Sequence, residues 1–309
     1  MFTTIVVGCD GSPGTTDAIA FAEQLREPEH GRLVLVSVFP YYRGFAAPLA
    51  PFAYATWLKE QAEDDLKRAA QSVSPGVPYE TQTIASPSAA AGLDDVAETV
   101  HADLLVIGPS HHGSVGKLTG RTTVQRMLHG SPCTIAVAAR GRRFGSESTI
   151  SVAFDGSAES RFALDTAYGI ATVTGARVRI CTALEPIVYA SGFGTPLPDL
   201  QYEREREHGV DTRLSALVAD APEDIAVETR RQWGAAAHTV LDLAGDDTGL
   251  IVAGSRGYGP LRRVLAGGVS AELLVNGEVP VLVTPRVVAA ADSEPDEIAA
   301  GAASISAGS

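Results

Sequence analysis

The hydrophobic positions of this chain form short apolar runs separated by stretches in which apolar residues recur every three or four positions. In the first half the runs occupy residues 5–9, 33–39, 79–84, 104–108 and 134–138. Runs that are apolar almost throughout are typical of strands covered on both faces of a parallel sheet. Helical spacing is found in three intervening sets: Ala18, Phe21, Ala22 and Leu25; Leu58, Ala62, Leu66 and Ala69; Leu93, Val96 and Val100. This alternation predicts an open, doubly wound α/β sheet with right-handed crossovers.

The pattern occurs twice along the chain. Three pairs of segments match at offsets of 145 or 146 residues: IVVGCDGS (5–12) with ISVAFDGS (150–157), LLVIGPSHHGSVGKL (104–118) with LIVAGSRGYGPLRRV (250–264), and MLHGSPCTIAV (127–137) with LLVNGEVPVLV (273–283). A near-constant offset predicts two tandem units, residues 1–144 and 145–288, each an open five-stranded parallel sheet with helices on both faces. Ligands of such sheets bind at the carboxyl ends of the strands, near the reversal of strand order.

Composition narrows the class of protein. The 309 residues include 24 Lys and Arg against 37 Asp and Glu, a formal net charge of −13, with 45% hydrophobic residues. This fits a globular protein of two domains and argues against broad nucleic-acid binding, which relies on clustered basic residues. The sequence contains no apolar run of membrane-spanning length and does not begin like a signal peptide. We therefore expect a cytoplasmic protein without membrane contact.

Three segments do not fit the alternating pattern. Residues 40–57 and 186–202 are long, aromatic and proline-rich, and both contain Gly-Phe followed by Pro-Leu. They are interpreted as loops that pack their own aromatic residues over the sheet edge, or as a flap or partner-docking surface. Residues 289–309 are small, acidic and polar, and are predicted to form a disordered tail, with an amphipathic helix near residues 294–300 as the alternative.

The glycine-rich segment 254–270 is the strongest candidate for a site. It follows an apolar strand, precedes an apolar helix, and contains Arg256, Arg262 and Arg263. A strand, a glycine-rich loop and a helix N-terminus can together bind an anion, because unpaired N–H groups and the helix dipole both favour negative charge. An ordinary glycine-rich turn is the alternative. The spacing matches neither a Walker A loop nor a dinucleotide fingerprint.

Asp10 and Asp155 follow the first predicted strand of each unit. Each is followed by Gly-Ser. An aspartate here can accept hydrogen bonds from a base or a ribose, but it can equally cap the next helix or form an Asx turn.

Asp-Gly-Ser after the first strand, combined with G-x2-G-x9-G at Gly254, Gly257 and Gly267, resembles the universal stress protein family. The resemblance covers residues 3–286. Within the family, the chain resembles tandem members of the actinobacterial type. It implies a Rossmann-like fold of the adenine nucleotide alpha hydrolase type. It also implies a regulator of stress or dormancy responses that binds ATP or another adenine nucleotide and has no dedicated enzymatic reaction.

The resemblance also implies roles for individual residues. Asp155 would reach the adenine and Ala183 would line the base, while the three motif glycines wrap the ribose and phosphates. Gly268 would contribute its backbone N–H, and Ser270 would donate to a phosphate. The corresponding positions in the first unit are Asp10, Val38, Gly108 and Thr122.

Both units depart from the family motif. The glycine that ends the motif is followed by Gly268 rather than Ser or Thr, which removes one hydroxyl donor. In the first unit, His111 and Arg121 stand where the second and third glycines belong, and a Cβ there obstructs phosphate approach if the backbone needs a positive φ. Alternatively, Arg121, Lys117 and His112 supply charge to a phosphate. We expect the second unit to bind nucleotide better, and we expect no metal site at His111 and His112.

Other functions remain open at this point. The chain could be a protein-interaction scaffold whose nucleotide sites have decayed, or a weak nucleotide hydrolase, although the sequence contains no recognisable catalytic motif. The family resemblance implies pairing through the last strands, residues 135–138 and 281–284, as an internal pseudo-dimer. A homodimer and an unidentified protein partner are further alternatives.

Overall fold

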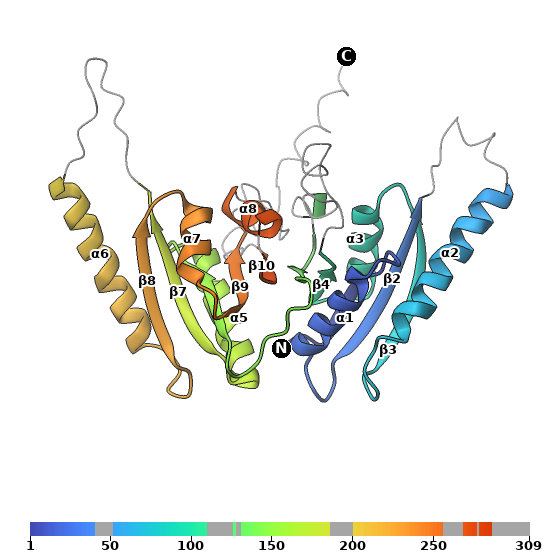
Figure 1. Cartoon of the computed structure of the whole chain (residues 1–309), viewed down its shortest axis with the longest axis horizontal. Coiled ribbons are helices and arrows are strands. Elements are labelled where there is room, and N and C mark those ends of the chain that lie inside the picture. Colours follow the sequence, from blue (N-terminus) through green and yellow to red (C-terminus); the bar gives the residue numbers. More distant parts are fainter. Residues whose placement is uncertain are drawn as a thin grey trace, which may run out of the picture.

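The computed structural model describes residues 1–40, 52–109, 126–127, 131–185, 200–255, 268–276 and 278–285 (Figure 1). The elements of the first unit are β1 (Thr4–Gly8), α1 (Gly14–Leu25), β2 (Arg32–Pro40), α2 (Phe52–Ala70), β3 (Tyr79–Ser86), α3 (Ala89–Thr99), β4 (Leu104–Ile107) and β5 (Thr134–Val137). Those of the second unit are β6 (Thr149–Ala153), α5 (Ala158–Thr174), β7 (Arg177–Leu184), α6 (Leu200–Ala219), β8 (Val227–Trp233), α7 (Ala236–Ala244), β9 (Thr248–Gly254), α8 (Gly268–Asn276) and β10 (Val281–Thr284).

The strands form one ten-stranded sheet in the order β3-β2-β1-β4-β5-β10-β9-β6-β7-β8. Within each unit every pairing is parallel, and the strand order reverses beside the first strand, between β1 and β4 and between β6 and β9. The two units join through β5 and β10, which pair antiparallel with Ala136 opposite Leu282. The predicted pairing of the last strands is therefore present. The two predicted doubly wound units share one continuous sheet.

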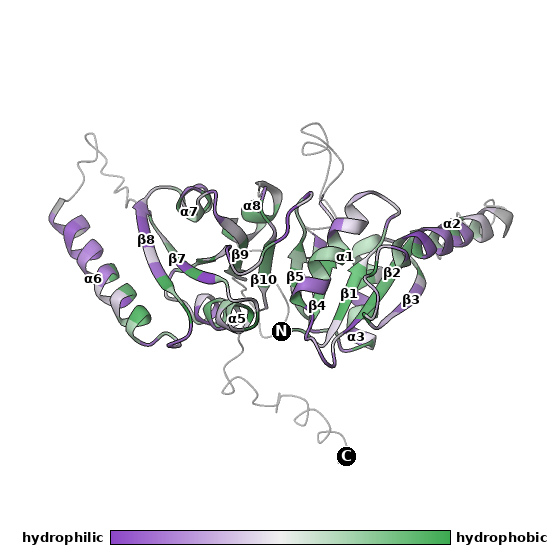
Figure 2. Ribbon diagram, turned by 60° about the horizontal axis from the view of Figure 1, so that its bottom comes forward, coloured by the Kyte–Doolittle hydropathy of each residue, from purple (hydrophilic) through white to green (hydrophobic). Residues whose placement is uncertain are grey.

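Alternation along the strands divides the core into two layers. In β1, Ile5 and Val7 pack toward α1 and α2, whereas Val6 packs on the opposite face, which α3 covers. In the second unit α5 and α6 lie on the first face, and α7 and α8 lie on the other. Both layers are apolar, as expected for a parallel sheet covered on both sides. Figure 2 shows that the outermost helices, α2 and α6, are mostly hydrophilic.

The linker between β5 and β6 also fastens the two units together. Phe144 is buried, and its ring meets that of Phe21 in α1 edge-on, with 6.0 Å between centroids. Gln24 Nε2 donates to the Phe144 carbonyl at 2.7 Å. On the other side, a Cβ at Gly249 would lie 2.5 Å from the Phe144 Cβ. Phe144 therefore packs between α1 of the first unit and β9 of the second.

Two of the segments interpreted as loops are partly helical. Residues 52–57 form the start of α2 and residues 200–202 the start of α6, so both predicted loops are shorter than the sequence indicated. The missed helical turns are polar and aromatic, without the apolar periodicity that identifies a buried helix face. The remaining parts, 41–51 and 186–199, and the predicted tail lie outside the described residues. Among the described helices, none combines the length and apolar character needed to cross a membrane.

Candidate functional site

A cavity of about 510 Å³ lies at the carboxyl ends of β6, β7 and β9. It is lined there by Asp155, Ala183 and Gly254, among others. This place is the reversal of strand order, since β6 has β7 on one side and β9 on the other. The connections that follow β6 and β9 leave toward opposite faces of the sheet and so open a crevice between them. Such a crevice is the usual ligand position in doubly wound sheets. Its volume falls within the range of about 300–1,000 Å³ typical of small-molecule sites.

Three helices begin at this cavity. Glu159 in the first turn of α5, Ala236 at the start of α7 and Gly268 at the start of α8 all line it. Each helix N-terminus exposes backbone N–H groups and carries a partial positive charge. Their convergence favours an anionic group in the cavity.

The Asp155 carboxylate is positioned by a tight turn. Ser157 donates to Asp155 Oδ1 from its backbone N and its Oγ, at 3.0 and 2.6 Å. The Ser157 hydroxyl in turn accepts from Ser160 N at 3.2 Å and is the N-cap of α5. Gly156 between them has a φ of +86°, which a side chain would strain. Asp155 therefore forms the Asx turn that was one of its two predicted structural roles. The other role, capping the next helix, is performed by Ser157.

The first unit has the same turn with one additional contact. Ser12 N donates to Asp10 Oδ1 at 3.0 Å, as in the second unit. The Thr15 hydroxyl adds a contact with the same oxygen at 3.2 Å. Helix α1 starts behind Pro13 without a side-chain cap. Asp10 therefore lies at the matching place in the first unit, where the Thr15 hydroxyl also contacts its carboxylate.

Gly254 and its counterpart Gly108 have a packing role that sequence reasoning missed. A Cβ at Gly254 would lie 2.7 Å from the carbonyl carbon and oxygen of Glu159, at the first turn of α5. A Cβ at Gly108 would lie 2.5 Å from the Gly14 carbonyl oxygen, at the first turn of α1. Both glycines let a strand end meet the backbone of a helix start, whether or not a ligand is bound.

The structure brings together part of the predicted site. The cavity is lined by five of its members: Asp155, Ala183, Gly254, Gly268 and Ser270. Asp10, Val38 and Gly108 lie at the corresponding edge of the first unit, after β1, in β2 and after β4. The predicted positions outside the described residues are Gly257, Gly267, Thr122, His111, His112, Lys117, Arg121, Arg256, Arg262 and Arg263.

Charged side chains that the sequence analysis did not select also line the cavity. Glu185 follows β7 and accepts from Ala236 N at 3.3 Å, so it binds the start of α7. Arg206 and Arg213 come from α6. Arg206 donates to the Glu185 carbonyl at 2.7 Å and lies 5.4 Å above the ring of Trp233. The i, i+4, i+7 spacing of Arg206, Val210 and Arg213 is the signal that places them on one helix face.

Thr182 contributes a buried polar atom to the same cavity. Its side chain is 7% exposed, and its hydroxyl oxygen has no hydrogen-bond partner within the part of the chain that the structure describes. Buried hydroxyls are normally paired, because an unpaired one costs about 1–3 kcal/mol. A polar group of a bound molecule would satisfy it.

Comparison with known proteins identifies the family. A model of the universal stress protein family matches residues 1–139 and again residues 148–285. The chain belongs to the universal stress protein family. A universal stress protein of Mycobacterium tuberculosis is 25% identical over 246 residues, covering 75% of this chain and 82% of that protein. One from Thermus aquaticus is 29% identical over 136 residues, covering 43% of this chain and 96% of that protein.

Solved structures agree on the fold. The crystal structure of a universal stress protein from Archaeoglobus fulgidus superposes with a TM-score of 0.68 at 17% identity, covering 92% of this chain and 98% of that chain. The predicted doubly wound α/β class is therefore confirmed, and the chain is a tandem universal stress protein.

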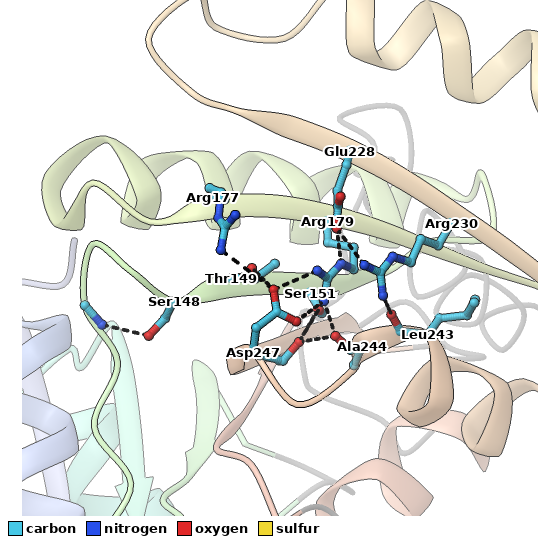
Figure 3. A network of polar contacts seen from close by, with 12 residues as sticks. Ser148, Thr149, Ser151, Arg177, Arg179, Glu228, Arg230, Leu243, Ala244 and Asp247 are labelled. Atoms are coloured by element: carbon cyan, nitrogen blue, oxygen red, sulfur yellow. Dashed lines mark hydrogen bonds and ion pairs between the residues drawn. The ribbon is translucent and has the colours of Figure 1, made fainter.

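A second polar cluster lies at the opposite, amino-terminal ends of the same strands (Figure 3). Arg179 in β7 is buried and binds Asp247 through two hydrogen bonds of 2.8 Å each. It also contacts Glu228 in β8 and the carbonyl of Ala244, the last residue of α7. A guanidinium at a helix C-terminus satisfies unpaired carbonyls and complements the helix dipole.

The cluster has a clear electrostatic consequence. Hydrogen bonds from the Arg179 guanidinium, with a further one from the Thr149 hydroxyl, hold the pKa of Asp247 well below its usual range. Asp247 therefore stays ionised at neutral pH and joins β6, β7 and the start of β9. We assign this cluster a structural role, because it lies away from the cavity.

The described cysteines are buried, and the two serines at the start of α5 are held by hydrogen bonds. Burial raises the pKa of the Cys9, Cys133 and Cys181 thiols to about 12 each, so they are protonated at neutral pH. In the cavity, the Ser157 hydroxyl donates to Asp155 and that of Ser160 donates to the Ser157 carbonyl at 3.0 Å. These groups stabilise the first turn of α5.

Proposed function

We propose that this tandem universal stress protein binds an adenine nucleotide, ATP, in the cavity of its second unit. The observation that carries the proposal is the position of the cavity, at the reversal of strand order and at the N-termini of three helices. An anion is favoured there by the exposed N–H groups and the helix dipoles, and nucleotides carry both an anionic and an aromatic part.

The residues around the cavity suit different parts of such a ligand. Asp155 presents carboxylate oxygens, the acceptors that an adenine amino group or ribose hydroxyls require. Ala183 is small and leaves room for a flat base beside β7. Ser270, in the first turn of α8, has a hydroxyl and lies where N–H groups are unpaired, which suits a phosphate.

The first unit offers less room at the corresponding places. Val38 stands where the second unit has Ala183, and α3 packs closely on it, since a Cβ at Gly92 would lie 2.8 Å from Val38 Cγ1. The Asp10 carboxylate is bound by Thr15 as well as by Ser12. These contacts support a stoichiometry of one nucleotide per chain, bound by the second unit.

The proposed role is regulatory rather than catalytic. Membership of the universal stress protein family supports a role in stress or dormancy responses. The serine hydroxyls at the start of α5 are used in the helix cap, and the described cysteines are buried and protonated. Nucleotide occupancy, rather than turnover, would then be the signal.

Native mass spectrometry of the freshly purified full chain tests the proposal. We expect one adenine nucleotide per chain, or binding of one equivalent when ATP is added to protein stripped of nucleotide. Saturation at about 100 times Kd should raise the free energy of unfolding of the occupied unit by about 2.7 kcal/mol, which a thermal shift detects. A protein that is empty and shows no shift in millimolar ATP would refute nucleotide binding and favour an interaction scaffold.

ATP hydrolysis should be measured on the same protein. Steady turnover that Asp155→Ala abolishes would overturn the regulatory role in favour of a weak hydrolase.

A further inference from the structure

The helix that follows the second strand carries opposite charges at one matching position in the two units. Leu66 of α2 and Leu214 of α6 are both buried in the same core layer and lie 148 residues apart. The β3 and β8 registers give the same offset, since Tyr79 pairs with Leu33 and Val227 with Val178. The residue before each leucine therefore corresponds: Asp65 in the first unit and Arg213 in the second.

In the first unit, Asp65 covers the turn after β1. A Cβ at Gly11 would lie only 2.5 Å from Asp65 Oδ1 and 2.8 Å from Oδ2, so this carboxylate lies directly over Gly11. The neighbouring Cys9 responds to the same charges: burial raises its pKa most, and the carboxylates of Asp10 and Asp65 raise it further. Two carboxylates therefore lie at this edge of the first unit, with Asp65 also contacting Arg68.

In the second unit the same place is open. A Cβ at Gly156, the counterpart of Gly11, would have no heavy atom of the described residues within 4 Å. Arg213 lines the same cavity as Gly156, and its Nε donates to the Gly209 carbonyl of its own helix at 3.2 Å. The described residues offer the Arg213 guanidinium no carboxylate partner.

Two further features indicate a ligand at this wall. Thr182 in β7, which lines the same cavity, has a buried hydroxyl without a partner in the described chain. Arg206 lies two helical turns before Arg213 on the same face and is held at the rim by the Glu185 carbonyl and the Trp233 ring. The wall formed by α6 thus presents two guanidinium groups where α2 presents Leu58 and Asp65.

We infer that Arg213 determines specificity: it makes the second site select a phosphate-bearing nucleotide over the uncharged nucleoside, while Asp65 disfavours anions at the matching place of the first unit. This inference rests on the proposed nucleotide binding and adds the residue that discriminates by charge. The physical reason is that a guanidinium attracts a phosphate, whereas a carboxylate repels it.

Titration calorimetry of the full chain with ATP and with adenosine tests the inference. The variants are Arg213→Asp, which copies the first unit, Arg213→Gln, which removes only the charge, and Arg204→Asp. The last is the matched control, because Arg204 is exposed on the same helix and does not line the cavity. Thermal unfolding of each variant checks the fold.

Arg213→Asp should raise the Kd for ATP about tenfold or more and that for adenosine less than about twofold. Arg213→Gln should raise the Kd for ATP about threefold, and Arg204→Asp less than about twofold at 0.15 M salt, where distant charges are screened. The loss on Arg213→Asp should shrink at 1 M salt for the same reason.

Two results would overturn the inference while leaving nucleotide binding intact. One is an equal loss of ATP and adenosine affinity on Arg213→Asp, which a merely structural arginine would cause. The other is an effect on ATP no larger than that of Arg204→Asp. If the wild-type chain, stripped of nucleotide, binds neither ATP nor adenosine, the proposed function itself fails.

Discussion

The two units share a topology but differ where their strands end. Both place Asp-Gly-Ser after the first strand and a glycine where the fourth strand meets a helix start. In the first unit Asp65 covers Gly11, whereas in the second the space at Gly156 is open and joins a cavity of about 510 Å³. The comparison teaches that the duplicated frame kept its turns and its packing glycines, while the side chains facing the site diverged.

The units also differ in their cores. Val6 faces Val34 in the first unit, and the register places Ser151 opposite Arg179 at the same position of the second. All four residues are buried. At this position the first unit has an apolar contact between neighbouring strands, whereas the second has a buried arginine whose partners include Asp247. Removing one partner of a buried ion pair lowers the free energy of unfolding strongly, and the contribution of such a pair depends on pH. The contribution of an apolar pair does not depend on pH.

The largest expected effect on this comparison comes from Asp247→Ala. It leaves the buried Arg179 guanidinium without the carboxylate that accepts two of its hydrogen bonds. We therefore expect the free energy of unfolding to fall by about 3 kcal/mol. This value is at the low end for a broken buried pair, because the Asp247 side chain is partly exposed. Urea unfolding at pH 7 measures it. Asp246→Ala is the control, since Asp246 is exposed, and should change stability by less than about 0.5 kcal/mol.

The same pair makes stability depend on pH in a defined direction. The folded-state pKa of Asp247 is depressed, mainly by the Arg179 hydrogen bonds, so its contribution is present above the unfolded pKa of about 3.9 and is lost as the pH falls through the folded value. Stability of the wild type should therefore decline below about pH 4 more steeply than that of Asp247→Ala. If the free energy of unfolding changed with pH equally in the two proteins, Asp247 would not be the group that causes the pH dependence.

Gly254→Ala and Gly108→Ala form the next test. Each new methyl would lie within 2.7 Å of the backbone at a helix start, so each should lower the free energy of unfolding by about 2 kcal/mol. Binding should separate them: the second-unit variant should lose nucleotide, and the first-unit variant should keep one per chain. Mass spectrometry and thermal unfolding measure both effects. Equal loss of nucleotide in the two variants would mean that the units act together.

A smaller effect is expected from the aspartate pair. Asp155→Ala should weaken ATP binding about tenfold, since a hydrogen bond to a charged group is worth about 1.5–3 kcal/mol. Loss of its turn contacts should also lower the free energy of unfolding by about 1 kcal/mol. Asp10→Ala should lower stability at least as much, because Thr15 is also a partner, but should leave ATP affinity unchanged. An ATP defect in Asp10→Ala would place a nucleotide in the first unit.

The smallest effect is a gain. A Cβ at Gly268 would meet no atom of the described part of the chain within 4 Å, and Gly268 is the first residue of α8 at the cavity. Gly268→Ser adds a hydroxyl at the helix N-terminus and should strengthen ATP binding about threefold, with stability changed by less than about 0.5 kcal/mol. Calorimetry of the full chain measures the affinity. A weaker affinity would show that the ligand needs the space that glycine leaves.

Much of the fold could be predicted from the sequence, because the signals are local. Near-continuous apolar runs such as that at residues 104–108 identified strands, and the paired Asp-Gly-Ser segments identified the duplication. The starts of α2 and α6 were missed, since exposed residues such as Tyr54 and Trp57 show no core-facing period. Of the candidate site, Asp155, Ala183, Gly254, Gly268 and Ser270 meet at one cavity.

The rest of the site could not be found along the chain. Arg206 and Arg213 read as ordinary charges on a polar helix until the fold places α6 against β8 and at the cavity. Arg179 reads as an exposed strand residue until Asp247, 68 positions later, comes within hydrogen-bond distance. The spacing of Arg206 and Arg213 puts them on one helix face, but what that face meets, like the partner of Arg179, depends on contacts between residues distant in sequence.

The sequence by itself determined the duplication, the order of strands and helices and the apolar faces, because neighbouring residues decide backbone conformation and amphipathicity. It offered the aspartate turns as one of several alternatives. Only the tertiary structure decided which charges face the site. It brought Asp65 over Gly11 in one unit, and in the other it placed Gly156 and Arg213 at the same cavity. It also gave Gly254 and Gly108 their packing role, because a steric clash exists only once a strand end and a helix start meet in space.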